Sequence, residues 1–496
     1  MNNWLVTKNN SLININEIPV VSLHGEIDTE DFHSIVLEKS KTTRPIGFFG
    51  KDWGFGNTRL FVLLADDKKG EIYITSSIFS QEEKSYESLT KEDARFHVFE
   101  REFFEQFGIK PLNHPWLKPL RINQDDYEFF DMKGEEVHQV AVGPIHAGVI
   151  EPGHFRFMCN GETVYHLEIM LGYQHRGVED MMTNNPSNQL AESITGDSVI
   201  AHNLAYSKLI ENLKGIKISD RAELIRKAAL EMERLAIHIG DMGAIAGDIA
   251  YSMGANVFGV TRTLVINTML EWSGSRFGRG LVTVGGVNYN LEQETIKNTL
   301  KMLEKVGADV ERMTKTMLKN STVMSRLEKT GTVSMEKAQE IGLVGMAAKS
   351  SGVDLDTRFD FPDKWIEALG LERKYFKGVG DVNSRFKLRY KEIKESISMI
   401  RKILNKLEEY KDEPVIADTN AEMTKDAMVV SITEGWRGEV IHIGMTDDSG
   451  NLSRYKIKDP SFNNWYGLGL AVRNNGISDF PLCNKSFNLS YSGNDL

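Results

Sequence analysis

Cysteine is almost absent from this chain, because its 496 residues include only Cys159 and Cys483. Two cysteines cannot form a disulfide framework, and they cannot supply four thiolates to a metal site within the chain. No stretch approaches the roughly 20 apolar residues that cross a bilayer. The first residues lack the basic start and apolar run of a signal peptide. These absences predict a cytoplasmic protein, either free or docked peripherally on a membrane complex.

Basic residues are also in the minority, since 59 Lys and Arg stand against 70 Asp and Glu and leave a formal net charge of -11. This balance disfavours nucleic acid and an anionic bilayer as main partners. Apolar residues make up 41% of the chain and charged residues 26%, as in an ordinary globular protein. At roughly 150 residues per domain, the length allows two or three domains.

The N-terminal quarter has the pattern of a small α+β domain. Residues 59–65 (RLFVLLA) form an apolar run that predicts a buried strand, and residues 71–75 (EIYIT) predict its partner. Residues 101–107 predict a helix. A linker is expected next, because dense proline resists helix and strand interiors; its prolines are Pro111, Pro115 and Pro119. We therefore expect a first domain at residues 1–125.

The second domain, at residues 126–496, is expected to be large and mainly helical. A short β region is predicted at 137–165, after which the apolar period becomes 3.6. Ser219 is placed to cap a helix whose apolar face recurs from Leu224 to Ile239. Further helices are predicted at 258–273, 291–319, 335–341 and 388–410. The fold class is therefore α+β, with a minor β region in the second domain.

Three groups of residues leave alternatives open. His146, His154, His166 and His175 lie close in sequence, but their spacing fits no zinc motif and is more typical of hydrogen-bonded or surface histidines. The glycines of residues 274–287 favour tight turns or close packing over a phosphate loop. The methionines on apolar helical faces are predicted to fill the core; they include Met232, Met242 and Met253.

Several segments, in collinear order, carry a family resemblance. Residues 100–109 (EREFFEQFGI), followed by His114 and Pro115, resemble a signature of the smaller of two peripheral-arm subunits of respiratory NADH-quinone oxidoreductase. From about residue 136, the chain resembles the larger of these subunits and the large subunit of membrane-bound nickel-iron hydrogenases of the formate hydrogenlyase and hydrogenase-4 type. The matching segments are VGPIH (142–146), EPGHF (151–155), HRGVE (175–179), GGV (285–287), WRGE (436–439) and DPSFNNW (459–465).

The chain departs from the hydrogenases at the metal site. Family hydrogenases hold nickel and iron with four thiolates from two C-x-x-C pairs, because soft sulfur ligands suit such a centre. The resemblance places these four positions at Thr195, Ser198, Ser490 and Gly493. We therefore expect no metal in this chain and no hydrogen turnover by it. A nickel-iron enzyme with oxygen ligands is the less favoured alternative.

The resemblance also implies a proton-relay role for Glu179 and a position for a quinone site. Glu179 occupies the position of the hydrogenases' proton-relay glutamate, and an apolar cleft would raise the pKa of its carboxyl. The alternative is a salt bridge to an arginine such as Arg176. Two quinone-contacting residues of the family fall at Pro152 and Leu190, so a quinone site would be relined.

Arg437 and two histidines complete the candidate site. Arg437 matches the arginine that faces the metal's diatomic ligands. Without a metal, its guanidinium would contact a substrate carboxylate or carbonyl, or pair with Asp197 or Asp495. His146 and His154 are the remaining cavity candidates. Together with Glu179, these are the predicted catalytic residues.

The function that the resemblance implies is an oxidoreductase subunit, active only within an energy-converting complex. A partner small subunit would bring an iron-sulfur cluster to the cavity, ferredoxin-like subunits would deliver electrons, and membrane subunits would translocate ions. No cofactor is expected in this chain; NAD would bind elsewhere in the complex, and the acceptor would be a quinone or a sulfur compound. The alternative is a non-catalytic coupling or scaffold subunit.

Overall fold

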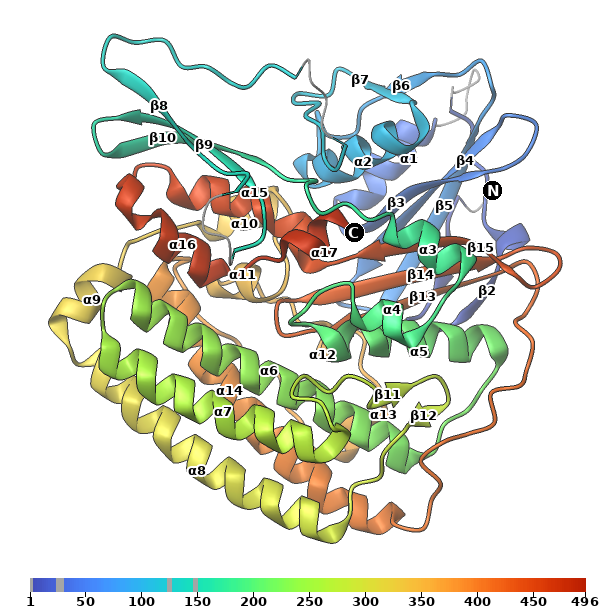
Figure 1. The fold of residues 1–496 in the computed structure, drawn as a ribbon. Helices are drawn as coiled ribbons and strands as arrows, with labels where there is room; N and C mark the ends of the chain where they lie inside the picture. The colour runs from blue at the N-terminus through green and yellow to red at the C-terminus, as the bar shows by residue number, and fades with distance from the viewer. Residues whose placement is uncertain (1–2, 24–30, 123–126, 146–149) are drawn as a thin grey trace.

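The computed structural model describes residues 3–23, 31–122, 127–145 and 150–496. Two antiparallel sheets stack on one another at one end, and a bundle of long helices extends from them (Figure 1). Among the described residues, none of the helices has the length and apolar content needed to cross a membrane.

The first sheet is built from the N-terminal part of the chain. Its strands lie in the order β1 (Leu5–Thr7), β5 (Glu71–Phe79), β4 (Thr58–Asp66) and β3 (Arg44–Asp52). Strand β4 is apolar on both faces because both are covered: Leu60 and Val62 face helices, whereas Phe61 and Leu63 face the second sheet. The elements around this sheet are η1 (Ile15–Glu17), α1 (Phe32–Ser40), β6 (Ser85–Glu87), η2 (Ala94–Phe96), α2 (His97–Phe107) and β7 (Lys110–Leu112).

The second sheet joins strands from the two ends of the chain. Its order is β15 (Leu452–Lys458), β14 (Glu439–Thr446), β13 (Ala427–Glu434) and β2 (Leu12–Asn14). Ile13 on β2 pairs with Met428 on β13, and both lie in the apolar layer between the sheets. The parts before and after residue 125 therefore share a core, and the boundary itself stays a prediction.

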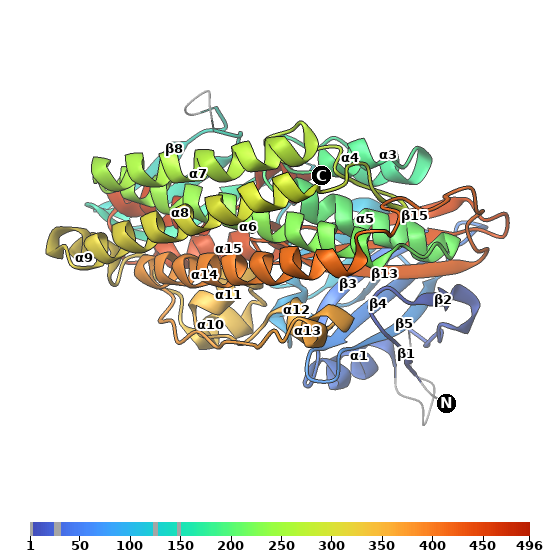
Figure 2. The same ribbon diagram turned by 90° about the horizontal axis from the view of Figure 1, so that it is seen from below.

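Helix α5 (Val199–Lys214) covers the far face of the second sheet, where Leu209 packs against Val429. Four long helices lie side by side in the bundle (Figure 2). They are α6 (Asp220–Asp248), α7 (Ser252–Ser273), α8 (Gln293–Leu318) and α14 (Val382–Lys406), which the 3.6 period largely anticipated. Ser219 caps α6 by accepting a hydrogen bond from the Ala222 backbone N–H at 3.1 Å, as predicted.

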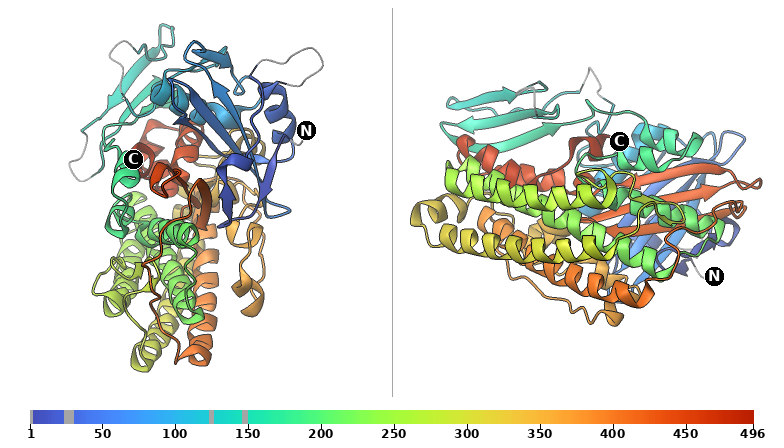
Figure 3. Two further views of the ribbon diagram at one scale, coloured as in Figure 1. Left: turned by 90° about the vertical axis from the view of Figure 1, so that its right-hand side faces the viewer. Right: turned by 60° about the horizontal axis from the view of Figure 1, so that its bottom comes forward.

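The predicted β region forms a separate antiparallel sheet, apart from the two stacked sheets (Figure 3). Its strands are β8 (Val137–Val142), β9 (His154–Asn160) and β10 (Thr163–Met170), and they pack against α15 (Pro460–Val472). The remaining elements are α3 (Val178–Asn184), α4 (Asn188–Glu192), β11 (Val282–Thr283), β12 (Gly286–Val287), α9 (Ser321–Leu327), α10 (Met335–Glu340), α11 (Gly345–Ser350), α12 (Thr357–Asp360), α13 (Lys364–Ala368), η3 (Leu407–Tyr410), η4 (Ile477–Asp479), α16 (Phe480–Phe487) and α17 (Tyr491–Asp495).

The structure contradicts the local predictions for Pro111 and Met253 and confirms the one for the glycines. Pro111, expected in a linker, lies within β7. Among the described residues β7 pairs with β6 alone, so it has a free edge at which proline is tolerated. Met253 is 52% exposed near the start of α7, whereas Met232 and Met242 fill the core as expected. Gly286 has a φ of +146°, and a Cβ there would lie 2.0 Å from the Val415 carbonyl oxygen. Close packing therefore explains this glycine.

We predict that the shared core makes the two parts of the chain unfold together. Ile443 is buried between the two sheets, so Ile443→Ala is expected to reduce the free energy of unfolding by about 2–5 kcal/mol. Denaturant titration followed by circular dichroism and by tryptophan fluorescence measures this. A Val260→Ala control, at a position 65% exposed, should change little. Separate transitions, with only one of them shifted by Ile443→Ala, would contradict the shared core.

Candidate functional site

The structure brings together the four positions at which the resemblance places thiolates. Thr195 Oγ1 accepts a hydrogen bond from the Ser198 backbone N–H at 3.1 Å, just before α5. Ser490 Oγ accepts one from the Gly493 backbone N–H at 2.9 Å, at the start of α17. A Cβ on Gly493 would lie 2.9 Å from Thr195 Cγ2, so the two pairs meet.

Asp459 fills the space beside Gly493. A Cβ on Gly493 would lie only 2.7 Å from Asp459 Cγ. The buried carboxylate accepts hydrogen bonds from His202 Nε2 at 3.1 Å and from the Ser461 backbone N–H at 2.8 Å. Burial alone would raise the pKa of Asp459, but the His202 hydrogen bond and the Arg437 charge outweigh it and lower the pKa to about 2. The carboxylate is therefore ionised.

A buried hydrogen-bonded chain leads away from Asp459. His202 Nδ1 lies 3.0 Å from His442 Nε2, and His442 Nδ1 lies 2.7 Å from the Tyr455 hydroxyl. Burial, followed by the His202 charge, puts the pKa of His442 well below its ordinary value, so this imidazole is neutral. Because ionised Asp459 only accepts, His202 donates to it from Nε2. The neutral His442 ring has one donor and one acceptor nitrogen, so its contacts with His202 and with the Tyr455 hydroxyl make the chain continuous.

Arg437 is held among protein groups. Its Nη2 donates to Asp197 Oδ2 at 2.8 Å and its Nε donates to the Asn488 carbonyl oxygen at 2.7 Å. The guanidinium also stacks over the Trp436 ring, with its central carbon 4.1 Å from the ring centroid. Of the two acids expected to pair with Arg437, Asp197 does so. Asp495 instead accepts hydrogen bonds from backbone N–H groups of residues 172 and 174.

The prediction that the pKa of the Glu179 carboxyl is raised is wrong. Glu179 Oε1 accepts from Lys456 Nζ at 2.6 Å and from the Ile457 backbone N–H at 3.1 Å. Burial would raise the pKa of this carboxyl, but the charges of Lys456, Arg454 and Arg121 lower it to about 2. Arg176 is not the partner; its guanidinium donates to the carbonyl oxygens of residues 193 and 194. The relay role of Glu179 stays a prediction.

Three of the four clustered histidines are described, and each of them contacts a different group, so these three do not form one site. His146 lies outside the described residues. His154 Nδ1 lies 3.3 Å from the Gly143 carbonyl oxygen, and His175 Nδ1 lies 2.7 Å from the Asp495 carbonyl oxygen. The His166 ring packs against the Phe130 ring at a tilted angle, with the centroids 4.7 Å apart. In the described part of the chain, no three or more His, Cys, Asp or Glu residues are grouped so that they could hold a metal ion.

Sequence reasoning missed Glu233. Its carboxyl oxygens accept hydrogen bonds from the backbone N–H groups of Ile200 at 2.6 Å and Ala201 at 3.3 Å, at the start of α5. Burial dominates over these hydrogen bonds and raises its pKa to about 8. Glu233 and Asp197 both line a small cavity of about 20 Å³. The 3.6 period places Glu233 beside the apolar face of α6, but nothing local indicates that the first turn of α5 covers it.

The lowered pKa of Glu179 predicts a pH-dependent contribution to stability. This contribution is complete above the ordinary pKa of 4.5 and is lost as the pH falls toward about 2, because the unfolded chain then takes up the proton first. Glu179→Gln, which removes one of the two buried carboxylates that pair with Lys456 and leaves Glu102, should therefore cost about 2 kcal/mol at neutral pH and less at about pH 3.

Denaturant unfolding of both proteins at the two pH values measures this difference. Glu311→Gln, which removes an exposed i,i+4 pair with Lys315, serves as the matched control and should change stability little. An equal loss from Glu179→Gln at both pH values would show that the ionised pair is not the source of the stabilisation.

The chain is similar to subunits of hydrogenase and NADH-quinone oxidoreductase complexes. It is 28% identical to formate hydrogenlyase subunit 5 of Escherichia coli over 472 residues, which cover 89% of this chain and 82% of the relative. It is 28% identical to membrane-bound hydrogenase subunit alpha of Pyrococcus furiosus over 372 residues, covering 72% and 87% of the two chains. It is 26% identical to NADH-quinone oxidoreductase subunit 4 of Thermus thermophilus over 371 residues, covering 69% and 90%.

A family match adds to these similarities. The sequence model for the 49 Kd subunit of respiratory-chain NADH dehydrogenase matches residues 248–495. This region includes the second sheet's strands β13, β14 and β15, together with Arg437, Asp459 and Ser490. The chain therefore belongs to the family of the 49 kDa subunit of respiratory-chain NADH dehydrogenase.

Proposed function

We propose that this chain is the large peripheral-arm subunit of a membrane-attached, energy-converting oxidoreductase complex and that it works without a nickel-iron centre. Its relatives are named as subunits of formate hydrogenlyase, membrane-bound hydrogenase and NADH-quinone oxidoreductase, which supports membership of such a complex. The chain would lie on the cytoplasmic side of the membrane through its partner subunits. Its own role would be to shape a redox cavity beside an iron-sulfur cluster held by a partner.

The arrangement around Asp459 carries the proposal for a metal-free site. The three hydroxyl residues at the thiolate positions offer hard oxygen atoms, and Gly493 offers no ligand. Two of these hydroxyls already accept backbone hydrogen bonds. A cysteine side chain at Gly493 would collide with Asp459 and Thr195. The residues present therefore do not fit a thiolate-bound nickel-iron centre.

The same residues can hold and orient protons. Ionised Asp459 accepts a hydrogen bond from His202, and the hydrogen-bonded chain continues through His442 to the Tyr455 hydroxyl. Glu233, with a pKa of about 8, is protonated at neutral pH and adds a proton donor near the start of α5. A diffusible acceptor such as a quinone or a sulfur compound would take electrons from the partner's cluster and protons from these groups. Any NAD would bind in another subunit.

The rival function is a non-catalytic coupling or scaffold subunit. It is favoured by the internal pairing of both charged candidates, since Arg437 is occupied by Asp197 and Glu179 by Lys456. A subunit of this kind would transmit conformational change without contacting the acceptor.

Metal content tests the proposal. In the affinity-purified complex, with subunits identified by mass spectrometry, elemental analysis is expected to find iron without nickel. Nickel in a one-to-one ratio with this chain would contradict the metal-free site. Absence of membrane and iron-sulfur subunits from the purified material would contradict membership of the complex.

Substitutions separate catalysis from scaffolding. Asp459→Asn removes the ionised acceptor of the proton chain at nearly unchanged volume, so electron transfer by the assembled complex should fall at least about 10-fold. Arg437→Met should act in the same direction. Lys337→Met, at an exposed position on α10, is the control and should leave assembly and rate unchanged. Full activity of the assembled Asp459→Asn and Arg437→Met complexes would support the scaffold function.

A further inference from the structure

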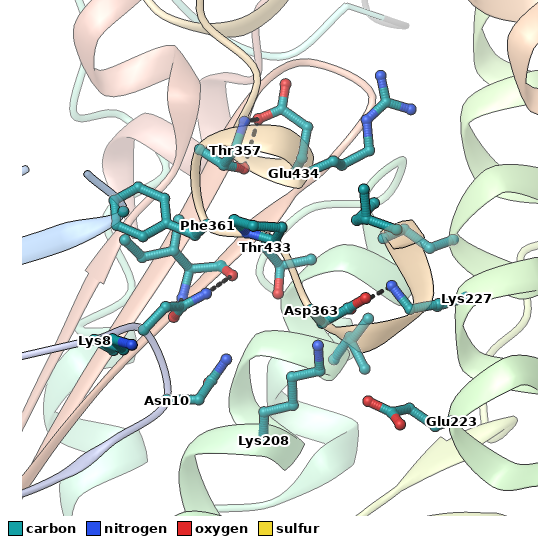
Figure 4. Close-up of a pocket in the computed structure, with 18 of the residues that line it drawn as sticks. Lys8, Asn10, Lys208, Glu223, Lys227, Thr357, Phe361, Asp363, Thr433 and Glu434 are labelled. Atoms are coloured by element: carbon teal, nitrogen blue, oxygen red, sulfur yellow. Dashed lines mark hydrogen bonds and ion pairs between the residues drawn. The ribbon is translucent and has the colours of Figure 1, made fainter. Parts of the chain in front are cut away.

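A cavity of about 570 Å³ lies away from the predicted catalytic residues, between the N-terminal strands and the helices (Figure 4). Its walls come from the turn at residues 8–10, the turn at 69–70, helices α5 and α6, residues 357–371 and the end of β13. Small-molecule sites commonly have volumes of roughly 300–1,000 Å³. The cavity is therefore large enough for a small organic molecule.

Two polar groups of this cavity have no hydrogen-bond partner among the residues that the structure describes. Thr433, on β13, is 5% exposed, and its Oγ1 is buried without a partner. Asn10 Oδ1, in the turn between β1 and β2, is likewise buried and unpaired. Figure 4 shows the Thr433 oxygen directed toward the space above Lys208. Because buried polar groups are almost always hydrogen-bonded, these two groups indicate a polar ligand.

The acids that line the cavity are already neutralised. Asp363 pairs with Lys227, Glu211 with Arg226 and Glu231 with Arg358. Glu434 accepts from Lys349 and Thr357, and Glu223 accepts from Trp365 Nε1 at 2.7 Å. The fixed negative charge of the walls is therefore largely matched by cations of the protein itself.

Among the described residues that line the cavity, Lys208 is a cation without an ion-pair partner. It projects from α5 into the cavity (Figure 4), and its ammonium group has no hydrogen bond or ion pair with any described residue. Burial lowers its pKa and the charge of Lys227 adds to this effect, while the carboxylates of Asp363 and Glu223 oppose it only in part. Lys8 adds a second ammonium group at the rim, also without a partner among the described residues. An anion would compensate both charges.

Apolar side chains line the rest of the cavity. They come from α5, α6, α14, β13 and the segment around α13, and they are Leu204, Leu230, Phe361, Ile366, Met399 and Ile432. We propose that this cavity binds a small organic anion, whose phosphate or carboxylate group accepts hydrogen bonds from Lys208 and Thr433 and whose apolar body packs against this wall. The site is independent of the function proposed above.

Isothermal titration calorimetry of the full-length chain with phenyl phosphate, benzoate and inorganic phosphate tests this site. We expect saturable one-site binding of phenyl phosphate or benzoate, and whichever binds more tightly identifies the anionic group. Inorganic phosphate should bind at least about 10-fold more weakly than phenyl phosphate if the phosphate group is recognised, because it lacks an apolar body.

Variants place the binding in this cavity. Lys208→Met should weaken binding at least about 10-fold, since a hydrogen bond to a charged group is lost. Thr433→Val removes an unpaired hydroxyl at equal volume, so it should weaken binding without reducing the free energy of unfolding. Lys337→Met on α10 is the matched control and should bind as wild type does. No saturable binding of any probe, or equal binding by Lys208→Met, would overturn the proposal.

Discussion

A buried carboxylate must be compensated by its surroundings, and Asp459 imposes this constraint on the whole candidate site. Its charge is balanced by a hydrogen bond from His202, a backbone N–H and the nearby guanidinium of Arg437. Because ionised Asp459 only accepts, it orients His202 with Nε2 as the donor, and His202 in turn contacts His442. The same carboxylate takes the space beside Gly493 in which a metal ligand would have to stand.

The stacked sheets hold this charge in position. Asp459 directly follows β15, His202 lies on the first turns of α5, and His442 lies on β14. These elements are fixed because the second sheet is covered on one face by α5 and on the other by the first sheet. The N-terminal strands therefore contribute to the site without supplying any of its polar groups. The cavity that contains Lys208 also borders α5, but along the later turns of this helix, from Leu204 onward.

The sequence predicted what depends on local pattern. The buried strand at residues 59–65 and the capped helix after Ser219 were anticipated, because burial and period are visible within one segment. The pKa direction of Glu179 was not, because its partner Lys456 is 277 positions away and nothing near either residue indicates the pairing. His202 and His442 are separated by 240 positions in the same way. The family resemblance predicts the four thiolate positions, and the structure adds that Asp459 lies beside one of them, Gly493.

The central claim is that protein groups, and no metal, occupy the space between the two pairs of former ligand positions. Anomalous diffraction from crystals of the purified complex, measured on both sides of the nickel absorption edge, tests this directly. We expect no anomalous peak near Thr195 and Ser490, and continuous density for the Asp459 carboxylate against His202. A nickel peak within bonding distance of Thr195, Ser198 or Ser490 would contradict the claim.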